Sequence, residues 1–336
     1  MASTTSIRDV ARLAGVSVGT VSNVLNKPDG VSPDSVARVQ QAIEQLGYIR
    51  NDAARRLRAG VSATVGFVVL DGQNPFFNDV VRGAEDEASK NGIAILLGNT
   101  DEDSSREGMY LDLFEEQRVR GVLIAPYGDI SERLQRLKSR DIPAVLVDRL
   151  NFDGRFSSVA VDSIAGGRMA AEHLIETGRR RIGFVGGPFD IRQVRDRLEG
   201  ARVAAEHSDH EVDIEVITTS AMTVAEGALA GGRLLDRPRS DWPDAIFAAN
   251  DLLALGVLQS LVAAGVPVPG QISLIGFDDI PFAAAAAVPL SSVRQPSRTI
   301  GQTALRILLE EADDPALIPR QTVYQPELVV RRSTQL

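Results

Sequence analysis

Short apolar runs that alternate with longer helical patterns are the feature of this 336-residue sequence that most restricts its fold. From Thr64 onward, each run is rich in Val, Ile, Leu or Ala and is followed by a stretch with helical spacing of apolar residues. This alternation is typical of parallel β-sheets covered by helices. The predicted strands are residues 64–70, 93–97, 121–125, 144–147, 182–185, 245–248 and 273–277.

These strands divide naturally near Val161 and Asp162, because seven of them exceed what one small sheet would hold. We therefore expect an α/β body made of two Rossmann-like parallel-sheet subdomains that face each other across a cleft. Ligands of such sheets bind beyond the carboxyl ends of the strands. Polar residues follow several of the predicted strands, which suits a hydroxyl-rich or otherwise polar small molecule. They include Asp71, Asp148, Arg149, Asn250 and Asp278.

Three short helical patterns precede the body, each opened by a capping residue. Ser6 begins a capping box, Ser17 caps the second pattern just after Gly15, and Ser32-Pro33 opens a third that ends at Gly47. Two short helices joined by a tight turn at a glycine, with a third closing the core, are typical of a helix-turn-helix unit. A helical bundle that contacts other proteins fits the same spacing.

The second helix of a helix-turn-helix unit lies in the major groove of DNA, so its outward residues would contact the duplex. Asn23 can donate and accept at once, which suits adenine, and Val18 could touch a thymine methyl group. Thr20 and Ser22 are better placed for phosphates. The residues that the pattern leaves outside are Val18, Gly19, Ser22, Asn23 and Asn26.

The charge of the chain is divided unevenly. The formal net charge is −9, yet residues 1–60 contain eight Lys and Arg against five Asp and Glu, leaving 28 basic and 40 acidic side chains in the remainder. A mildly basic amino-terminal segment on an acidic body favours a nucleic-acid contact by that segment alone.

The sequence lacks the residues that several classes of function require. The sequence contains no cysteine, and His173, His207 and His210 are its three histidines, so we predict no metal site and no catalytic group. It also lacks the glycine-rich cofactor loops and the serine-nucleophile motif of common enzymes, so we expect no cofactor and no enzyme activity. Without an apolar run of signal-peptide or membrane-span length, we expect a cytoplasmic protein with no membrane partner.

The amino-acid sequence of the three amino-terminal helical patterns closely resembles the DNA-binding signature of the LacI/GalR family of bacterial transcription regulators. The body resembles the effector domain of that family, which is related to periplasmic sugar-binding proteins. The matching stretches are Asp9-Val10-Ala11, Ala14-Gly15-Val16-Ser17, Thr20-Val21-Ser22-Asn23-Val24-Leu25-Asn26, Asn74-Pro75-Phe76-Phe77, Arg195-Asp196-Arg197-Leu198-Glu199-Gly200, Ala249-Asn250-Asp251, Gly276-Phe277-Asp278-Asp279, Val293-Arg294-Gln295-Pro296 and Glu327-Leu328-Val329-Val330-Arg331.

This resemblance implies a division of the chain into three parts. Residues 1–49 would form the helix-turn-helix domain, residues 50–61 a hinge helix or linker, and residues 62–336 the domain for effector binding and dimerisation. Within the last part, one subdomain would comprise residues 62–161 and 292–322, and the other residues 162–291 and 323–336.

For DNA contact, the resemblance implies that Leu57 inserts between base steps in the minor groove while neighbouring arginines neutralise phosphates. An ordinary charged linker is the alternative for this segment. The full set of predicted DNA-contacting residues is Ser6, Ser17, Val18, Gly19, Thr20, Ser22, Asn23, Asn26, Tyr48, Asn51, Arg55, Arg56 and Leu57.

For the effector, the resemblance implies hydrogen bonds from Arg197, Asn250 and Asp278, and packing by Phe76 and Phe77. Alternatively, Arg197 pairs with Glu199 or Asp251, Asp278 caps a helix, and Phe76 belongs to the core. Met222 falls near a position that is often aromatic in sugar-responsive relatives. The predicted effector-binding residues are Asp71, Phe76, Phe77, Asp148, Arg149, Arg197, Met222, Asn250 and Asp278.

Together these features predict a homodimeric, sequence-specific regulator, with repression as the expected direction. It would bind a near-palindromic double-stranded operator, and a small polar effector such as a sugar would control its affinity. The alternatives are a regulator controlled mainly by a partner protein, a solute-binding protein, and an enzyme acting on polar small molecules.

The insertion assigned to Leu57 is testable by substitution. Leu57→Ala should weaken operator binding by more than about 0.5 kcal/mol, because a lost wedge costs more than an ordinary surface change. Fluorescence anisotropy titration of a labelled operator duplex measures the difference. An affinity that stays within about 0.5 kcal/mol of the parent would contradict the insertion.

Overall fold

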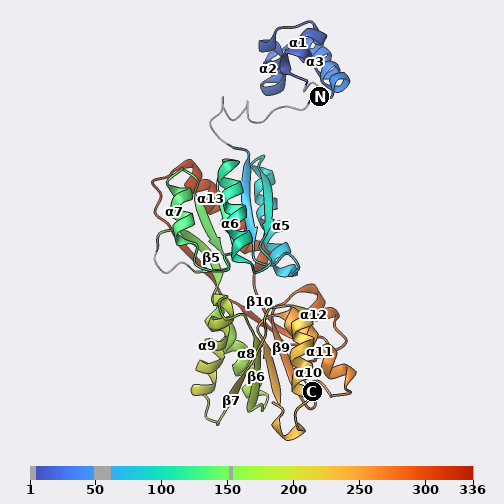
Figure 1. Ribbon diagram of the computed structural model, residues 1–336, viewed down its shortest axis with the longest axis vertical. Helices are drawn as coiled ribbons and strands as arrows, with labels where there is room; N and C mark the ends of the chain where they lie inside the picture. The colour runs from blue at the N-terminus through green and yellow to red at the C-terminus, as the bar shows by residue number, and fades with distance from the viewer. Residues whose placement is uncertain (1–4, 49–61, 151–153, 336) are drawn as a thin grey trace. The chain divides into compact units, whose positions relative to one another are not determined.

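The computed structural model describes residues 5–48, 62–150 and 154–335, and the chain divides into two units between Val61 and Ser62. We call the residues up to Val61 the head and those from Ser62 onward the body. In Figure 1 the head is helical, whereas the body consists of two lobes in which helices surround a sheet. The predicted combination of a helical segment and two parallel-sheet subdomains is therefore confirmed.

The described part of the head contains the three predicted α-helices. The hydroxyl oxygen of Ser17 accepts a hydrogen bond from the Thr20 amide at 3.0 Å and caps the second helix. Gly15, with a φ of 64°, makes the tight turn before it. Val10 and Val21 are fully buried where the helices meet. The elements are α1 (Ile7–Ala14), α2 (Val18–Asn26), the 3-10 helix η1 (Pro28–Gly30) and α3 (Pro33–Leu46).

Each lobe of the body is built on one sheet, and each sheet has six strands among the described residues. The first sheet has the order β11-β5-β4-β3-β1-β2, and its neighbouring strands are parallel. The second has the order β12-β10-β9-β8-β6-β7, and β12 pairs antiparallel with β10. The strands are β1 (Thr64–Val69), β2 (Ala94–Asn99), β3 (Val122–Ile124), β4 (Ala144–Val147), β5 (Ser157–Val161), β6 (Arg181–Gly186), β7 (Asp213–Thr218), β8 (Ala245–Ala248), β9 (Ser273–Asp278), β10 (Ser291–Arg294), β11 (Gln321–Tyr324) and β12 (Glu327–Val329).

Helices cover both sheets of the body. α5 packs along α13 in the first lobe, while α8 packs along α9 and α10 along α11 in the second (Figure 1). The helices are α5 (Pro75–Lys90), α6 (Ser104–Glu116), α7 (Ser131–Lys138), α8 (Ser163–Glu176), α9 (Arg192–Glu206), α10 (Val224–Leu235), η2 (Arg239–Asp241), α11 (Asp251–Ala263), α12 (Pro281–Ala285) and α13 (Ser297–Asp313).

The chain crosses from the first lobe to the second near Asp162. It crosses back to the first lobe after β10 and again to the second lobe after β11, through short segments. The sheets place the two later crossings a few residues beyond the expected boundaries at about residues 291/292 and 322/323. β10 continues to Arg294 in the second sheet, and β11 continues to Tyr324 in the first. Both strands are short and carry polar side chains, so no apolar run marks where they end.

All seven predicted strands are present within a residue or two of their expected ends. The described residues form five further strands: β5, β7, β10, β11 and β12. These strands were not predicted, because polar residues interrupt the apolar pattern by which strands were recognised in the sequence. Ser157 and Ser158 of β5, and Ser291 and Ser292 of β10, are fully buried, and each hydroxyl donates a hydrogen bond to another part of the body.

A pair of glycines lets α8 and α9 approach closely. A Cβ at Gly167 of α8 would lie 2.1 Å from the carbonyl oxygen of Arg197, and one at Gly200 of α9 would lie 2.0 Å from that of Ile164. No side chain fits at either position unless the helices separate. This contact sets the position of α9, which carries Arg197 toward the cleft.

The helix contact predicts the effect of adding one methyl group. Gly200→Ala should lower the free energy of unfolding by about 1–3 kcal/mol, because it overpacks the α8–α9 contact. Gly232→Ala is the matched control, since a Cβ there would meet nothing within 4 Å. The control should be neutral or stabilising by up to about 1 kcal/mol, because alanine favours helix more than glycine does. Urea unfolding measures both, and equal effects would contradict the close approach.

Candidate functional site

Asp278, the last residue of β9, is the centre of a buried network in the cleft between the lobes. Asn74, at the start of α5 in the opposite lobe, donates from Nδ2 to Oδ2 of Asp278 at 3.0 Å. Gln295, in the segment between β10 and α13, donates from Nε2 to Oδ1 at 2.8 Å. One carboxylate is thus held from both sides of the cleft, and it couples the position of one lobe to the other.

A second bridge joins Asp148, which follows β4, to Gln193 of α9. The Gln193 Nε2 atom donates to the backbone oxygen of Asp148 at 2.5 Å and to its Oδ2 atom at 2.9 Å. Asp148 and Asp278 both have positive φ angles, 57° and 105°. Non-glycine residues rarely adopt this conformation, and it concentrates at ligand-binding positions.

Arg197 supplies the positive charge of the cleft and is almost fully buried. Its Nη1 atom donates to the carbonyl oxygen of Ala249 at 2.5 Å, and its Nη2 atom lies 3.7 Å from Oδ1 of Asp278. The guanidinium also stacks 3.7 Å from the centre of the Phe277 ring.

The alternative roles considered for Arg197 and Asp278 are not the observed ones, whereas Phe76 does belong to the hydrophobic core. Arg197 pairs with Asp278 rather than with Glu199 or Asp251. Asp278 binds side chains across the cleft, and Ile280 occupies the capping position of the helix that follows.

Four buried polar atoms of this network have no hydrogen-bond partner among the residues that the structure describes. They are Oδ1 of Asp148, Oε1 of Gln193, Nε of Arg197 and Oε1 of Gln295. Unpaired buried polar atoms cost roughly 1–3 kcal/mol each and are uncommon in folded proteins. Their concentration at one cleft indicates a place where a polar ligand completes the hydrogen bonding.

Apolar side chains form the rest of the cleft wall. Phe76 and Phe77 of α5 meet edge to face with ring centres 5.1 Å apart, and Met222 lies on the opposite lobe. All three are less than a tenth exposed. The cavity that they share with Asp148, Arg197 and the other cleft residues has a volume of about 20 Å³, so the lobes are closed on one another here.

Asn250 also faces this cavity, although most of its bonding capacity is used by the fold. Its side-chain oxygen accepts from the Leu253 amide at 2.9 Å, which caps α11, and its Nδ2 atom donates to the carbonyl oxygen of Met222 at 3.1 Å. One amide hydrogen is left for a ligand.

Two predicted residues lie outside the shared cavity. Asp71 accepts from the Gln73 amide at 2.8 Å and shapes the turn after β1. Arg149 donates to the carbonyl oxygen of Gly128 and lines a separate hollow beside the cleft. The remaining predicted residues come together, namely Phe76, Phe77, Asp148, Arg197, Met222, Asn250 and Asp278.

The sequence prediction missed Asn74, Gln193 and Gln295. Asn74 and Gln295 stand inside the stretches that carry the family resemblance, so their motifs offered a signal. No sequence signal pointed to Gln193, because an amide in the first turn of a helix looks like an ordinary surface residue. It is 6% exposed and bridges the lobes.

Burial changes the acidity of the cleft carboxyls. Burial raises the pKa of Asp148 to about 7, against an opposing effect of the Arg197 charge. Burial likewise raises the pKa of Asp278, while Arg197, Asn74 and Gln295 oppose the shift. At the cleft edge, burial and the nearby charge of Asp71 raise the pKa of Glu102 to about 7. The cleft therefore disfavours additional negative charge.

In the head, α2 presents the residues predicted to read DNA. Val18 is 38% exposed, and Gly19 and Asn23 are exposed as well. Thr20 and Ser17 bond each other through their hydroxyls at 2.9 Å. At α1, the amide and hydroxyl of Ser6 both donate to the Asp9 carboxylate. Partly buried residues of the predicted DNA-contacting set are Thr20, Ser22 and Tyr48.

Part of the predicted DNA-contacting set cannot be placed. Asn51, Arg55, Arg56 and Leu57 lie outside the described residues, as does the side chain of Asn26.

Among the residues that are described, no cluster of His, Cys, Asp and Glu could hold a metal ion. No helix within the same ranges is long and apolar enough to cross a membrane.

Family models match both units of the chain. Residues 6–51 match the model of bacterial regulatory proteins of the lacI family, and residues 171–334 match a periplasmic binding protein-like domain. The transcriptional repressor PurR of Aliivibrio fischeri is 34% identical over 330 residues, which cover 98% of both chains. The ribose operon repressor of Escherichia coli is also 34% identical, covering 98% of this chain and 99% of its own.

This chain belongs to the LacI family. A solved structure of the transcriptional regulator CelR in complex with cellobiose is 33% identical, with a TM-score of 0.72, covering 98% of this chain and 99% of its own. The lac repressor dimer, solved with operator and the anti-inducer ONPF, is 24% identical with a TM-score of 0.84, over 99% of each chain, and shares the fold. The protein is thus a DNA-binding transcription regulator with a helix-turn-helix domain, and not an enzyme.

The raised pKa of Asp148 makes the stability of the regulator depend on pH. A carboxyl with a pKa of 3.8 when unfolded and about 7 when folded destabilises the fold progressively as pH rises between these values. Asp148→Asn should remove this penalty, which reaches at most about 4 kcal/mol above pH 7.

Urea unfolding at pH 5 and pH 8 measures the effect. The stabilisation by Asp148→Asn should be larger at pH 8, whereas Asp209→Asn, at an exposed position, serves as the control for losing a carboxylate. A gain that is equal at both pH values would contradict the ionisation assigned to Asp148.

Proposed function

We propose that this protein represses transcription by binding a near-palindromic operator as a homodimer, and that a small, neutral, hydroxyl-rich molecule in the cleft controls its operator affinity. The observation that carries the proposal is the set of unpaired buried atoms on Asp148, Gln193, Arg197 and Gln295. Three of these atoms are oxygens that accept hydrogen bonds, and one is a donor. A ligand rich in hydroxyl groups complements both kinds.

Charge in the cleft selects against an anionic effector. Arg197 is the cation at the centre, and Asp278 already lies beside it. Asp148 and Glu102 add carboxyls whose pKa values are raised, mainly by burial. An incoming phosphate or carboxylate would therefore increase an unfavourable concentration of negative charge. Neutral hydroxyl groups can accept from Arg197 and donate to the carboxylates without this cost.

The apolar side chains of the cleft can pack against the apolar faces of the ligand. Phe76, Phe77 and Met222 surround the polar centre, and alternating polar edges and apolar faces are characteristic of a sugar ring. The names of two relatives support a sugar, because one is a ribose operon repressor and another was solved with cellobiose. We therefore infer a sugar or a closely related polyol as the effector.

We assign the recognition of DNA bases to α2, and the electrostatic attraction of DNA to the segment that follows α3. Residues 5–48 contain four basic and four acidic side chains, and Arg12 and Arg38 are paired with Asp9 and Asp34. The positive surplus of the first sixty residues comes instead from residues 50–58. Asn23 of α2 provides sequence readout, whereas the arginines of the following segment provide affinity that falls with salt.

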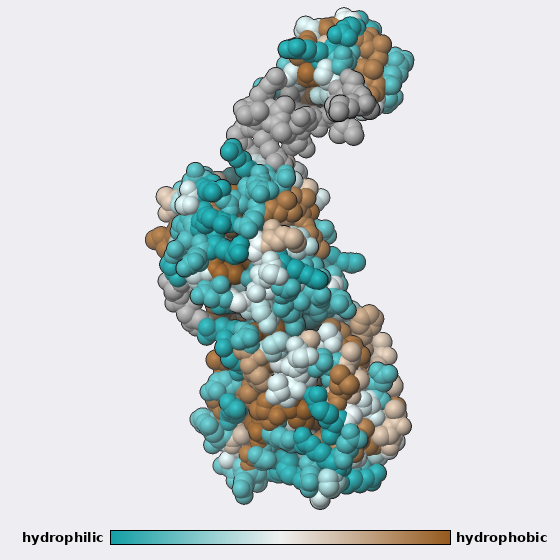
Figure 2. Space-filling model, in the orientation of Figure 1, coloured by the Kyte–Doolittle hydropathy of each residue, from teal (hydrophilic) through white to brown (hydrophobic). Residues whose placement is uncertain are grey.

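Exposed apolar residues of the body support the homodimer. On β2 and the neighbouring α6, Leu96 and Leu97 are 38% and 52% exposed, and Met109 and Leu113 are 56% and 42% exposed. On the second lobe, Leu229 and Phe282 are both 57% exposed. Figure 2 shows brown, hydrophobic areas that interrupt a mostly teal surface on one face of the body. We propose that a second copy of the chain covers these residues in the cytoplasm, where the operator lies.

Control of DNA binding follows from the cross-cleft bonds. An effector that bonds to Asp148 and Asp278 competes with Gln193 and Asn74 for the same oxygens, and so changes the angle between the lobes. It shifts the DNA-competent population only if its affinity differs between the two lobe arrangements.

Two substitutions should separate DNA binding from effector binding. Asn23→Ala should lose about 1–3 kcal/mol of operator affinity and keep sugar affinity, because it removes a base contact only. Asp278→Asn should weaken sugar binding by at least about tenfold, because it replaces one charged acceptor in the cleft, and should reduce the change in operator affinity that the sugar causes.

Calorimetry with ribose and cellobiose, and anisotropy with operator DNA, measure the two affinities of the full-length protein. Gln40→Ala, at an exposed position of α3, is the control for an amide on the head. If Asn23→Ala binds operator like the parent, the assignment of α2 is wrong. If neither sugar nor any related polyol shifts operator affinity, the proposed effector class is wrong.

A further inference from the structure

A second cavity lies in the first lobe, at the opposite end of β4 from the effector cleft. Ala144, the first residue of β4, lines this cavity, whereas Asp148, which follows the strand, lines the cleft. The cavity has a volume of about 270 Å³, close to the lower limit of about 300 Å³ for small-molecule sites. Its size and separation from the cleft make it a distinct candidate for a small metabolite.

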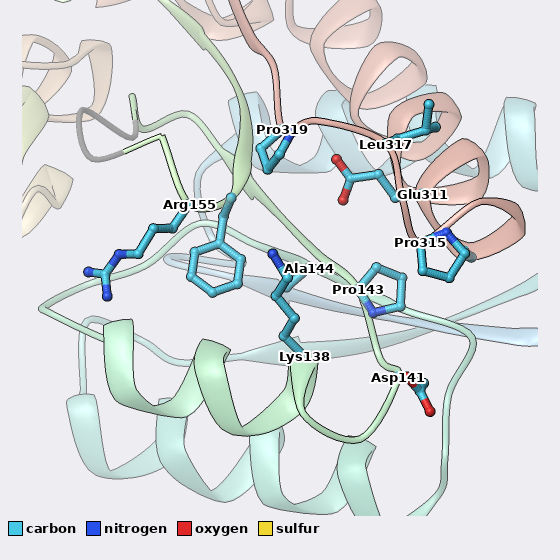
Figure 3. A pocket seen from close by; sticks show the side chains of 11 residues that line it. Lys138, Asp141, Pro143, Ala144, Arg155, Glu311, Pro315, Leu317 and Pro319 are labelled. Carbon is cyan, nitrogen blue, oxygen red and sulfur yellow. The ribbon is translucent and has the colours of Figure 1, made fainter.

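Opposite charges face this cavity from two helices. Lys138 ends α7 and Glu311 lies in the last turns of α13, and Figure 3 shows the ammonium and the carboxylate pointing into the same space. Arg155 and Asp141 extend away from that space in the same view. No ion pair joins Lys138 to Glu311 within the described residues, so the cavity separates the two charges.

Each charge has a local contact that holds it in place. The Lys138 Nζ atom lies 5.7 Å from the centre of the Phe156 ring. Glu311 accepts a hydrogen bond from the hydroxyl of Ser157, which positions the carboxylate at the cavity. Burial raises the pKa of Glu311 despite this bond and the charges of Arg320 and Lys138, which lower it. A cation placed directly beside the carboxylate would relieve that cost.

The remaining lining is apolar. The ring of Phe156 is buried, and the loop after α13 contributes Pro315, Leu317 and Pro319. Leu317 is 43% exposed and the next residue, Ile318, is 87% exposed. An apolar group of a ligand would cover part of this surface while its charged groups face the two helices.

We propose that this cavity is a second ligand site, which binds a small apolar α-amino acid as its zwitterion. The carboxylate of the amino acid pairs with Lys138, its ammonium pairs with Glu311, and its side chain packs against Phe156 and Leu317. A ligand with only a carboxylate is repelled by Glu311, and one with only an amine is repelled by Lys138. A neutral sugar uses neither charge, so this site differs in chemistry from the cleft.

Calorimetry of the full-length protein tests the proposal with three related probes: L-leucine, 4-methylpentanoate and 3-methylbutylamine. L-Leucine should bind once per chain, and the analogues that lack one charged group should bind at least about tenfold more weakly, because each loses a charge-assisted contact. Equal binding of either analogue, or no binding of L-leucine, would overturn the proposal.

Substitutions locate the binding. Lys138→Met and Glu311→Gln should each weaken L-leucine binding by at least about tenfold, whereas Lys90→Met, also at the end of a helix, should leave it unchanged. Glutamine at position 311 keeps an acceptor for Ser157, and Lys138 is exposed, so both variants should retain the parent melting temperature. L-Leucine binding that survives both substitutions would place the ligand elsewhere and contradict the assigned site.

Discussion

The buried carboxylate of Asp278 is the constraint on which the body of this regulator depends. It receives hydrogen bonds from Asn74 of one lobe and from Gln295 of the connecting segment, and it lies beside Arg197 of the other lobe. A charge in such a place is stable only while its partners remain. A molecule that replaces Asn74 at this carboxylate removes a bond between the lobes, so under the proposed function the same side chain both supports the fold and senses the effector.

The fold was largely predictable because its signals are local. Apolar β-branched runs such as residues 64–70 favour strands, and the capping serine at position 17 with Gly15 marks a turn by itself. Strands β5 and β10 escaped prediction because their buried serines satisfy their hydroxyls through distant parts of the chain, such as Glu311 and Asp251. Such partners cannot be read from local spacing.

The candidate site was predictable to a similar extent and for a related reason. Residues that follow strands, such as Asp148 and Asp278, were found because the carboxyl ends of parallel strands meet at one edge. Gln193 was missed because its importance arises from the opposite lobe. Asp71 was predicted on the same ground as Asp148, yet its side chain closes a turn, since position after a strand does not determine where a side chain points.

A crystal structure of the full-length regulator with whichever of ribose and cellobiose shifts its operator affinity tests the central claim most directly. The account predicts sugar hydroxyls bonded to Oδ1 of Asp148 and to Oε1 of Gln193 and Gln295, with the bond between Asn74 and Asp278 broken or rearranged. A sugar bound outside the cleft, or one that leaves these atoms unpaired and the bond between Asn74 and Asp278 intact, would contradict it.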